Sequence, residues 1–219
     1  MKAFASWSGG KDSCLAFCEA LRRGLRVSHL VNFVYGGLVR SHGVSAGLVR
    51  LQAELAGLPV VQVETGWEDY EYNFKRAALS LIPLGVKGMV FGDIYVEEHR
   101  RWVERVCGEL GLEAVEPLWG MKPRGVISRL LDYGIEAVIV SARSSIIGEE
   151  WAGRLVSWEF VDFLEERGID VCGENGEYHT LVVKAPVFRG RVNVKVERVV
   201  REGDRWVAVV SLAGVHSGF

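Results

Sequence analysis

An alternation of apolar runs and helical patterns, separated by glycines, is the strongest constraint on the fold of this 219-residue chain. Helical patterns end at Gly24, Gly57, Gly85, Gly111 and Gly134, and a short β-rich run follows each glycine. Glycine suits the left-handed residue after a helix, and apolar strands between amphipathic helices favour a parallel sheet covered on both faces. The sequence therefore predicts an α/β fold with a doubly wound, mostly parallel sheet, whose ligand crevice lies at the carboxyl ends of its strands.

The C-terminal part of the chain has a different pattern. A helix is expected over about residues 155–167, followed by the polar segment GENGEYHT at 173–180 and the run TLVVKAP. The final runs, NVKVERVV and RWVAVVSLAGV, alternate in polarity around the turn signal Glu202-Gly203-Asp204, which predicts an antiparallel hairpin. We therefore predict an α/β domain over 1–122 and a smaller α+β domain over 123–219 that ends in this β-hairpin.

The composition argues against several classes of protein. The 26 Lys and Arg against 28 Asp and Glu give a net charge of −2, so no global positive field attracts nucleic acid, and direct nucleic-acid binding is not expected. The sequence shows neither a signal-peptide pattern nor a run of 18 apolar residues, so we expect a cytoplasmic protein that does not use a membrane. Cys14, Cys18 and Cys107 lie on apolar helix faces, and with Cys172 they form no zinc-type spacing, which predicts buried core thiols.

The segment SGGKDS at residues 8–13 lies between a predicted strand, KAFASW, and a helix predicted to begin at Ser13. Unpaired backbone N–H groups at a helix start attract anions, and glycines let phosphate oxygens approach the main chain. A lysine and two hydroxyls add further donors. The candidate phosphate-binding residues are therefore Ser8, Gly9, Gly10, Lys11, Asp12 and Ser13.

Asp12 is the unusual member of this segment, because a carboxylate repels phosphate unless it caps the helix or holds a bridging Mg²⁺. The alternative interpretation is a plain glycine turn in which Asp12 is the N-cap and Lys11 lies in solvent. The segment lacks the spacing of the Walker A and GxGxxG motifs. The combination of residue types nevertheless favours a phosphate site, with Asp12 as a candidate magnesium ligand.

SGGKDS closely resembles the PP-loop of ATP pyrophosphatases, which cleave ATP between the α and β phosphates. Further motifs are RSHGV at 40–44, GMVFGDIYVEEHRRWVERVC at 88–107, EPLWG at 116–120 and GENGEYHT. Together they resemble the diphthine–ammonia ligase family in its short archaeal form, over about residues 1 to 190. The resemblance implies a HUP-like, PP-loop ATPase fold for the first domain and substrate binding for the second.

The same resemblance implies a substrate and a reaction. The substrate would be a modified histidine on translation elongation factor 2 that carries a carboxylate and a trimethylammonium group. ATP with Mg²⁺ would activate the carboxylate as an acyl adenylate, and ammonia would displace AMP to leave an amide, with pyrophosphate as the other product. The α/β core and tail leave no length for a glutaminase domain, so ammonium is expected to arrive free. A homo-oligomer is compatible with the sequence.

The resemblance also suggests roles in nucleotide binding. Lys11, with Mg²⁺ near Asp12, would stabilise charge at the α phosphate. Gly92 and Asp93 follow a predicted strand and should face the same crevice, where Asp93 is a candidate for a metal or ribose contact. His42, with Ser41, could approach the nucleotide, and a helix-capping role is equally compatible with the residues alone.

GENGEYHT is the candidate substrate site, with Glu174, Asn175, Glu177, Tyr178 and His179 as its residues. Its anions and aromatic ring suit a trimethylammonium group through charge and cation–π attraction. His179 could orient the carboxylate or deprotonate ammonium. The alternative is a polar turn with solvated glutamates and a packed tyrosine.

Two further predictions concern arginine and histidine side chains near this region. Arg143 ends a predicted strand and could pair with a phosphate or with a carboxylate of GENGEYHT, which makes it a candidate substrate-binding residue. His99 follows Asp93 on a helix and is predicted to lie on a solvated basic face. The candidate catalytic residues overall are Lys11, Asp12, Glu174, Glu177 and His179.

Two other functions compete with this interpretation. The first is another PP-loop adenylating enzyme that modifies tRNA, although such enzymes favour a basic surface, and those that transfer sulfur favour cysteine pairs. The second is a non-catalytic ATP-binding sensor, which would not need the second polar cluster in GENGEYHT.

Overall fold

The computed structural model describes residues 1–39 and 42–217. Arg40 and Ser41, which belong to the RSHGV motif, lie outside the described residues. The elements in chain order are β1 (Lys2–Ser6), α1 (Lys11–Arg22), β2 (Arg26–Tyr35), β3 (Leu38–Val39), α2 (Ala46–Ala56), β4 (Val60–Glu64), α3 (Tyr70–Leu81), η1 (Ile82–Leu84), β5 (Gly88–Val90), α4 (Glu97–Leu110), β6 (Glu113–Val115), α5 (Pro123–Asp132), β7 (Glu136–Arg143), η2 (Glu149–Trp151), α6 (Trp158–Glu166), β8 (Tyr178–Lys184), β9 (Gly190–Glu202) and β10 (Arg205–Ser217).

The first sheet confirms the predicted doubly wound topology. Its parallel strands run in the order β4, β2, β1, β5, β6, and the short β3 pairs antiparallel with the end of β2. The chain moves outward from β1 through β2 to β4 and then crosses to the other side of β1 for β5 and β6. The strand order therefore reverses between β1 and β5, where the carboxyl ends of parallel strands leave a crevice for a ligand.

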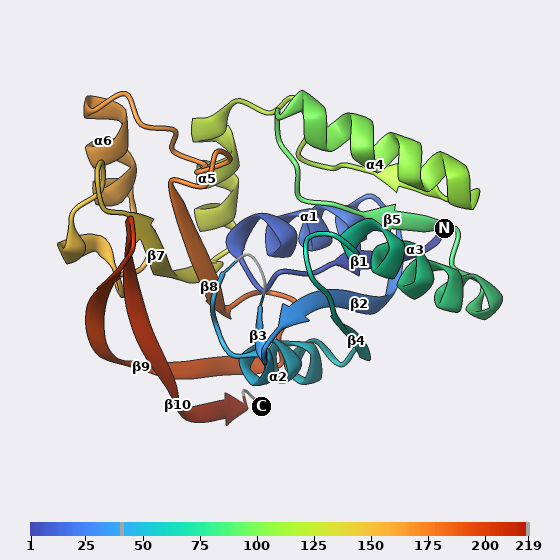
Figure 1. The fold of residues 1–219 in the computed structure, drawn as a ribbon, viewed down its shortest axis with the longest axis horizontal. Helices are drawn as coiled ribbons and strands as arrows, with labels where there is room; N and C mark the ends of the chain where they lie inside the picture. Colours follow the sequence, from blue (N-terminus) through green and yellow to red (C-terminus); the bar gives the residue numbers. More distant parts are fainter. Residues whose placement is uncertain (40–41, 218–219) are drawn as a thin grey trace.

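The alternating side chains of β1 separate two hydrophobic clusters. Ala3 and Ala5 join the cluster formed with α1, α2 and α5, whereas Phe4 joins the cluster formed with α3 and α4. Such two-sided burial stabilises a parallel sheet, since each apolar face is removed from water. Figure 1 shows α1 and α4 in the helical layers around β1 and β5.

The second sheet is antiparallel, in the order β8, β7, β10, β9. The prediction that all five glycine-bounded runs pair in parallel is therefore wrong for the run after Gly134, which forms β7 of this second sheet. Its periodicity could not distinguish the two cases, because a strand covered on both faces is continuously apolar in either sheet. The division of the chain at residues 122 and 123 stays a prediction.

The terminal hairpin forms as predicted around Gly203 and Asp204, with Gly203 at a φ of +58°. Its two long strands curve beneath β8 and reach the side of α2 (Figure 1). At the other end of the sheet, Val182 of β8 donates its backbone N–H to the carbonyl of Gly9. The second sheet is thus attached to the first at the β1–α1 turn.

The four cysteines are all buried and unpaired, as predicted for the core thiols Cys14, Cys18 and Cys107. Over residues 1–39 and 42–217, no helix has both the length and the apolar character needed to cross a membrane.

A buried carboxylate joins α1 to α5. Glu19 is 1% exposed and accepts hydrogen bonds from Arg22, Arg129 and Tyr133, at 2.9, 3.0 and 3.1 Å. Burial opposes ionisation of this carboxyl, but the three hydrogen bonds outweigh burial and lower its pKa below the ordinary 4.5. Glu19 therefore stabilises the fold in its ionised form.

We expect Glu19→Ala to lower the free energy of unfolding by about 1–3 kcal/mol at neutral pH, because it removes three hydrogen bonds to a buried charge. The difference from wild type should shrink as pH falls below 4.5, since a carboxyl with a lowered pKa loses its stabilising effect on protonation. Urea titrations at several pH values measure this. Glu166→Ala, whose side chain is 76% exposed, is the control. A pH-independent difference would contradict the assignment.

Candidate functional site

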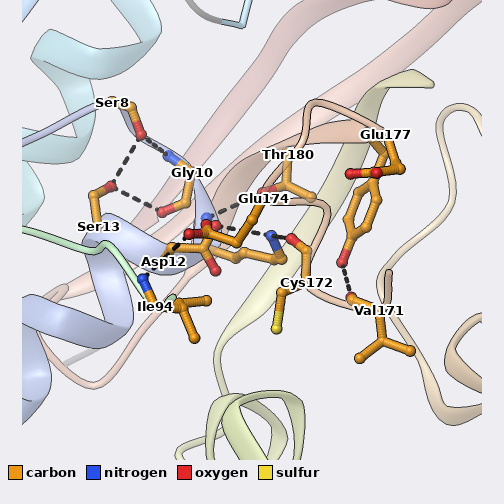
Figure 2. Close-up of polar contacts among 12 residues, drawn as sticks. Ser8, Gly10, Asp12, Ser13, Ile94, Val171, Cys172, Glu174, Glu177 and Thr180 are labelled. Carbon is orange, nitrogen blue, oxygen red and sulfur yellow. Dashed lines mark hydrogen bonds and ion pairs between the residues drawn. The ribbon is translucent and has the colours of Figure 1, made fainter. Parts of the chain in front are cut away.

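The glycine turn connects β1 to α1 at the point where the strand order reverses. Helix α1 begins at Lys11, two residues before the predicted start, because Gly10 serves as the N-cap; Asp12 lies in the first turn and is not the cap. Gly9 has a φ of +81°, a conformation that favours glycine. The Ser8 hydroxyl accepts a hydrogen bond from the Gly10 N–H at 3.3 Å and lies 3.2 Å from the Ser13 hydroxyl (Figure 2).

Both glycines allow a close approach that a larger residue would prevent. A Cβ on Gly9 would lie 2.7 Å from Oε1 of Gln52, and a Cβ on Gly10 would lie 2.8 Å from Nε2 of His42. Gln52 is fully buried on α2, and its amide donates to the carbonyls of Gly9 and Val182, at 3.1 and 2.7 Å. This side chain fixes the turn between the two sheets.

Lys11 is buried, which excludes the alternative of a lysine in solvent. Its Nζ donates to the Cys172 carbonyl at 2.5 Å and to the Asp12 carboxylate at 2.8 Å, and its backbone N–H donates to Thr180 Oγ1 at 3.0 Å (Figure 2). Burial opposes the charge of Lys11, but the Asp12 carboxylate, together with Tyr178 and Cys172, outweighs burial and raises the lysine pKa. Lys11 is therefore a permanent cation that binds the glycine turn to the GENGEYHT segment.

Tyr178 faces this lysine and not an open pocket. Its ring is 2% exposed, Nζ of Lys11 lies 4.6 Å from the ring centroid, and its hydroxyl donates to the Val171 carbonyl at 2.6 Å. The cation on this ring is thus supplied by the protein itself. The prediction that Tyr178 contacts a trimethylammonium group through its ring is therefore wrong. The ring is packed in the interior, as the alternative of a packed tyrosine predicted.

Three side chains next to the glycine turn could hold a cation. Ligand atoms of Asp93, His99 and Glu174 all lie within 4.8 Å of one another, with Nδ1 of His99 3.1 Å from the Asp93 carboxylate. Glu174 accepts a hydrogen bond from the Ile94 N–H at 3.2 Å (Figure 2). The sequence predicted that His99 lies on a solvated basic face. In the structure His99 also belongs to this group of possible ligands. The two carboxylates offer the oxygen ligands that Mg²⁺ prefers, whereas the imidazole of His99 is a ligand more typical of transition-metal ions.

The carboxylates in this region lack enough positive charge to balance them. Burial, together with the nearby Asp12 carboxylate, raises the pKa of Glu174 to about 7. Burial also raises the pKa of Asp12 by more than the contact with Lys11 lowers it. Among the residues that the structure describes, Oδ1 of Asp12 is buried without a hydrogen-bond partner. An unpaired buried carboxylate oxygen is costly, so the site fits a bound cation.

Gly92 brings this group of carboxylates against the helix start. A Cβ on Gly92 would lie 2.7 Å from the backbone carbon of Asp12 and 2.9 Å from the Ser13 nitrogen. The predicted proximity of Gly92 and Asp93 to the glycine turn is therefore observed, since the loop after β5 touches the backbone of α1.

The remaining polar groups of GENGEYHT mainly shape the segment itself. Glu177 is buried, and its carboxylate accepts the backbone N–H of Asn175 at 3.0 Å. Arg143 donates to the Asn175 carbonyl at 2.7 Å, a backbone oxygen of GENGEYHT and not one of its carboxylates, and the predicted pairing with a phosphate stays a prediction. These contacts fix the turn beside the site. The alternative interpretation expected solvated glutamates, whereas Glu177 is buried and Glu174 is partly buried.

His42 and His179 lie next to each other, with ring centroids 5.0 Å apart. Burial, followed by the charges of Arg205 and Lys11, lowers the pKa of His179 to about 4. Burial likewise lowers the pKa of His42, with His179 and Lys11 adding to the shift. The lowered pKa makes His179 a weaker base toward ammonium, and both expected roles, orientation of the carboxylate and deprotonation of ammonium, stay predictions.

A groove opens at the carboxyl ends of β1, β2 and β4. Its inner part is lined by Ser6, Trp7, Ser8, Asn32, Phe33, Val39, Trp67 and Tyr70. It continues into an outer part of about 840 Å³ that also contains Trp67 and Val39. This volume lies within the range of about 300–1,000 Å³ that is typical of small-molecule sites. The groove therefore reaches Ser8 of the glycine turn from the side of the first sheet.

Sequence reasoning missed Gln52, Thr180 and the Cys172 carbonyl. The sequence did offer a signal for Gln52: it is a polar residue on the helix whose apolar face includes Leu48 and Leu55, and a polar residue there indicates a buried hydrogen-bonding role. Thr180 ends the GENGEYHT motif, but nothing in the sequence pairs it with Lys11. A backbone carbonyl such as that of Cys172 leaves no signal in a sequence.

The strand order, with SGGKDS at its point of reversal, defines a nucleotide-binding α/β protein of the PP-loop class. Within that class, the chain belongs to the diphthamide synthase family. Residues 1–114 match the family model of the diphthamide synthase N-terminal domain, and residues 122–214 match that of its C-terminal domain. The chain is thus an enzyme of the ligase type.

Curated relatives extend over nearly the whole chain. The diphthine–ammonia ligase of Rattus norvegicus is 27% identical, covering 99% of this chain and 92% of that protein. That of Homo sapiens is 26% identical over 97% of this chain and 90% of its own. The diphthine–ammonia ligase of Schizosaccharomyces pombe is 26% identical over 93% of this chain but only 38% of its own length.

Among solved structures, a predicted subunit of tRNA methyltransferase from Methanocaldococcus jannaschii is similar with a TM-score of 0.45 and 16% identity, covering 85% of this chain and 98% of that one. The fold assignment depends on the strand order described above.

Proposed function

We propose that this enzyme amidates diphthine on translation elongation factor 2 to diphthamide, using ATP and ammonia and releasing AMP and pyrophosphate. One structural observation supports this proposal in addition to family membership. The GENGEYHT segment lies directly on the glycine turn, through Lys11 with Thr180 and the Cys172 carbonyl. A protein that only senses ATP does not need a second polar segment fixed at its phosphate turn.

The two parts of the site suit the two parts of ATP. The glycine turn offers hydroxyls, helix N–H groups and the cation Lys11 to the phosphates. The groove lined by Trp67 and Phe33 adjoins Ser8 and offers aromatic surface to the nucleoside. The phosphates would therefore point from the groove toward GENGEYHT.

The proposed chemistry has two steps. A substrate carboxylate oxygen attacks the α phosphate and pyrophosphate leaves; ammonia then attacks the carbonyl carbon of the acyl adenylate, and AMP leaves with the original carboxylate oxygen. Lys11 and the start of α1 stabilise negative charge on the phosphates. Mg²⁺, when bound by Asp93, His99 and Glu174 beside Asp12, would neutralise phosphate charge. The buried segment around Glu177 and Tyr178 limits access of water, which would otherwise hydrolyse the adenylate.

Reaction products distinguish this function from its rivals. Purified enzyme would be incubated with ATP, Mg²⁺, ammonium and elongation factor 2 that carries diphthine. We expect AMP, pyrophosphate and a factor whose mass decreases as OH is replaced by NH₂. Formation of ADP, or AMP formation that requires tRNA and ignores the factor, would contradict the proposal. The latter result would instead support a tRNA-modifying adenylating enzyme.

We expect Glu177→Ala to reduce kcat/KM for the elongation factor by about tenfold while leaving the Kd for ATP unchanged, because it removes the carboxylate that closes the Asn175 turn. Glu177→Gln is the matched control: its amide oxygen still accepts the Asn175 N–H, and activity should largely return. Steady-state kinetics and ATP titration give the two values. Equal losses of ATP affinity and factor use in Glu177→Ala would contradict the separation of the two binding regions.

A further inference from the structure

A second cavity adjoins the outer part of the groove at Trp67, with which it shares the lining residues Leu38 and Gly43. It has a volume of about 470 Å³, and its polar lining includes His42, Ser45, Ser141, His179 and Arg205. The terminal hairpin closes it through Val207–Val210 of β10. The cavity adjoins the phosphate turn, since Nε2 of His42 would lie 2.8 Å from a Cβ on Gly10.

Arg205 is the cation among the described lining residues of this cavity, and its hydrogen bonding is incomplete. Its Nε donates to Ser141 Oγ at 2.5 Å, and its Nη1 donates to the Gly176 carbonyl at 3.0 Å. Its Nη2 is buried and has no hydrogen-bond partner within the described part of the chain. A buried guanidinium N–H without an acceptor costs free energy, so this position favours an acceptor from a ligand.

The other groups of the cavity add donors without balancing this charge. His42 and His179 are kept neutral by burial and by nearby cations, and a neutral imidazole still offers one N–H. Of the nearby acids, Glu177 is directed to the Asn175 N–H, and Glu202 and Asp204 are exposed. The cavity therefore combines the partly unpaired Arg205 guanidinium with several donors, while Glu202 and Asp204 are exposed, and this arrangement fits an anion.

We infer that this cavity binds the carboxylate of the acceptor substrate, with Arg205 of the terminal hairpin as the residue that holds and orients it. The inference rests on the proposed function. The phosphates of ATP have their own donors at the glycine turn, whereas the carboxylate must lie beside that turn to reach the α phosphate. A planar guanidinium suits a carboxylate, and among the described residues that line the cavity it is Arg205 of the hairpin that supplies one. The hairpin is thus part of the substrate site.

Arg205→Gln tests the inference, with Arg201→Gln as the matched control. Arg201 lies on the same hairpin but is exposed, with its guanidinium over Trp206. We expect Arg205→Gln to lower kcat/KM for the elongation factor about thirtyfold or more while the Kd for ATP stays unchanged. Arg201→Gln should retain both values. A proportionate loss of ATP affinity in Arg205→Gln, or no loss of kcat/KM, would overturn the inference.

A second readout does not depend on activity. NMR signals of the His42 and His179 rings would be followed in the full-length protein during titration with acetate and, separately, with inorganic phosphate. We expect acetate to shift both rings in wild type but not in Arg205→Gln, with His29 unaffected. A response to phosphate alone would overturn the carboxylate assignment. If wild type responds to acetate but forms no amide, the proposed function fails and the carboxylate pocket stands.

Discussion

Lys11→Met should reduce the rate of AMP formation by about 10²–10³, the loss typical of removing one group that stabilises transition-state charge. The substitution keeps the apolar stem but removes the cation that contacts Asp12, the Cys172 carbonyl and the Tyr178 ring. Single-turnover measurement of AMP from labelled ATP gives the rate. The fold should also lose about 2 kcal/mol or more, because Asp12 is left without its partner.

Lys184→Met provides the control for this prediction. Lys184 lies at the end of β8, its side chain is 53% exposed, and it pairs with Glu136 at the surface. We expect it to leave both AMP formation and the urea midpoint close to wild type. If Lys11→Met formed AMP as fast as Lys184→Met while remaining folded, Lys11 would have no part in the chemistry.

Gly92→Ala should reduce turnover by an amount similar to that expected for Lys11→Met, although it changes only the packing of the backbone. The added Cβ would lie 2.7–2.9 Å from backbone atoms of Asp12 and Ser13, and backbone at a helix start cannot rotate away as a side chain can. Either the loop that carries Asp93 or the start of α1 must shift. We expect stability to fall by about 1–3 kcal/mol and turnover by about 10²-fold, since displacements near 1 Å are costly to catalysis.

The control for this packing effect is Gly108→Ala. Gly108 lies in α4, and a Cβ there would meet nothing within 4 Å. Alanine at this helical position should raise stability by about 0.5–1 kcal/mol, and turnover should not change. Thermal unfolding and AMP formation would be measured for both variants. Wild-type turnover in Gly92→Ala would show that the contact between this loop and α1 does not position the site.

The parallel sheet was predictable because each strand is a short apolar run with a glycine at the preceding helix end. The same signal misassigned β7, since the sequence records burial on both faces but not the direction of the neighbouring strand. The hairpin was predictable from its turn residues. The position of the hairpin beside His42 and His179 was not predictable, because it depends on how two sheets pack and not on local pattern.

The site was predictable where one segment supplies its own chemistry, as SGGKDS does. It was less predictable where function depends on a contact between distant segments. The cation near Tyr178 proved to be Lys11, and His99 joined Asp93 and Glu174, because folding brings together residues that no spacing relates. Arg205 lies 194 positions after Lys11 in the same chain, so only the structure could place it beside the glycine turn.

The most direct test uses diphthine whose carboxylate carries the heavy isotope of oxygen. The enzyme would act on this factor with unlabelled ATP, Mg²⁺ and ammonium, and mass spectrometry would measure both the AMP and the factor. Because AMP leaves with one carboxylate oxygen, we expect one heavy oxygen in AMP, and an amide on the factor that retains the other. Unlabelled AMP would exclude an acyl adenylate, and ADP with an unchanged factor would contradict ATP-dependent amidation by this enzyme.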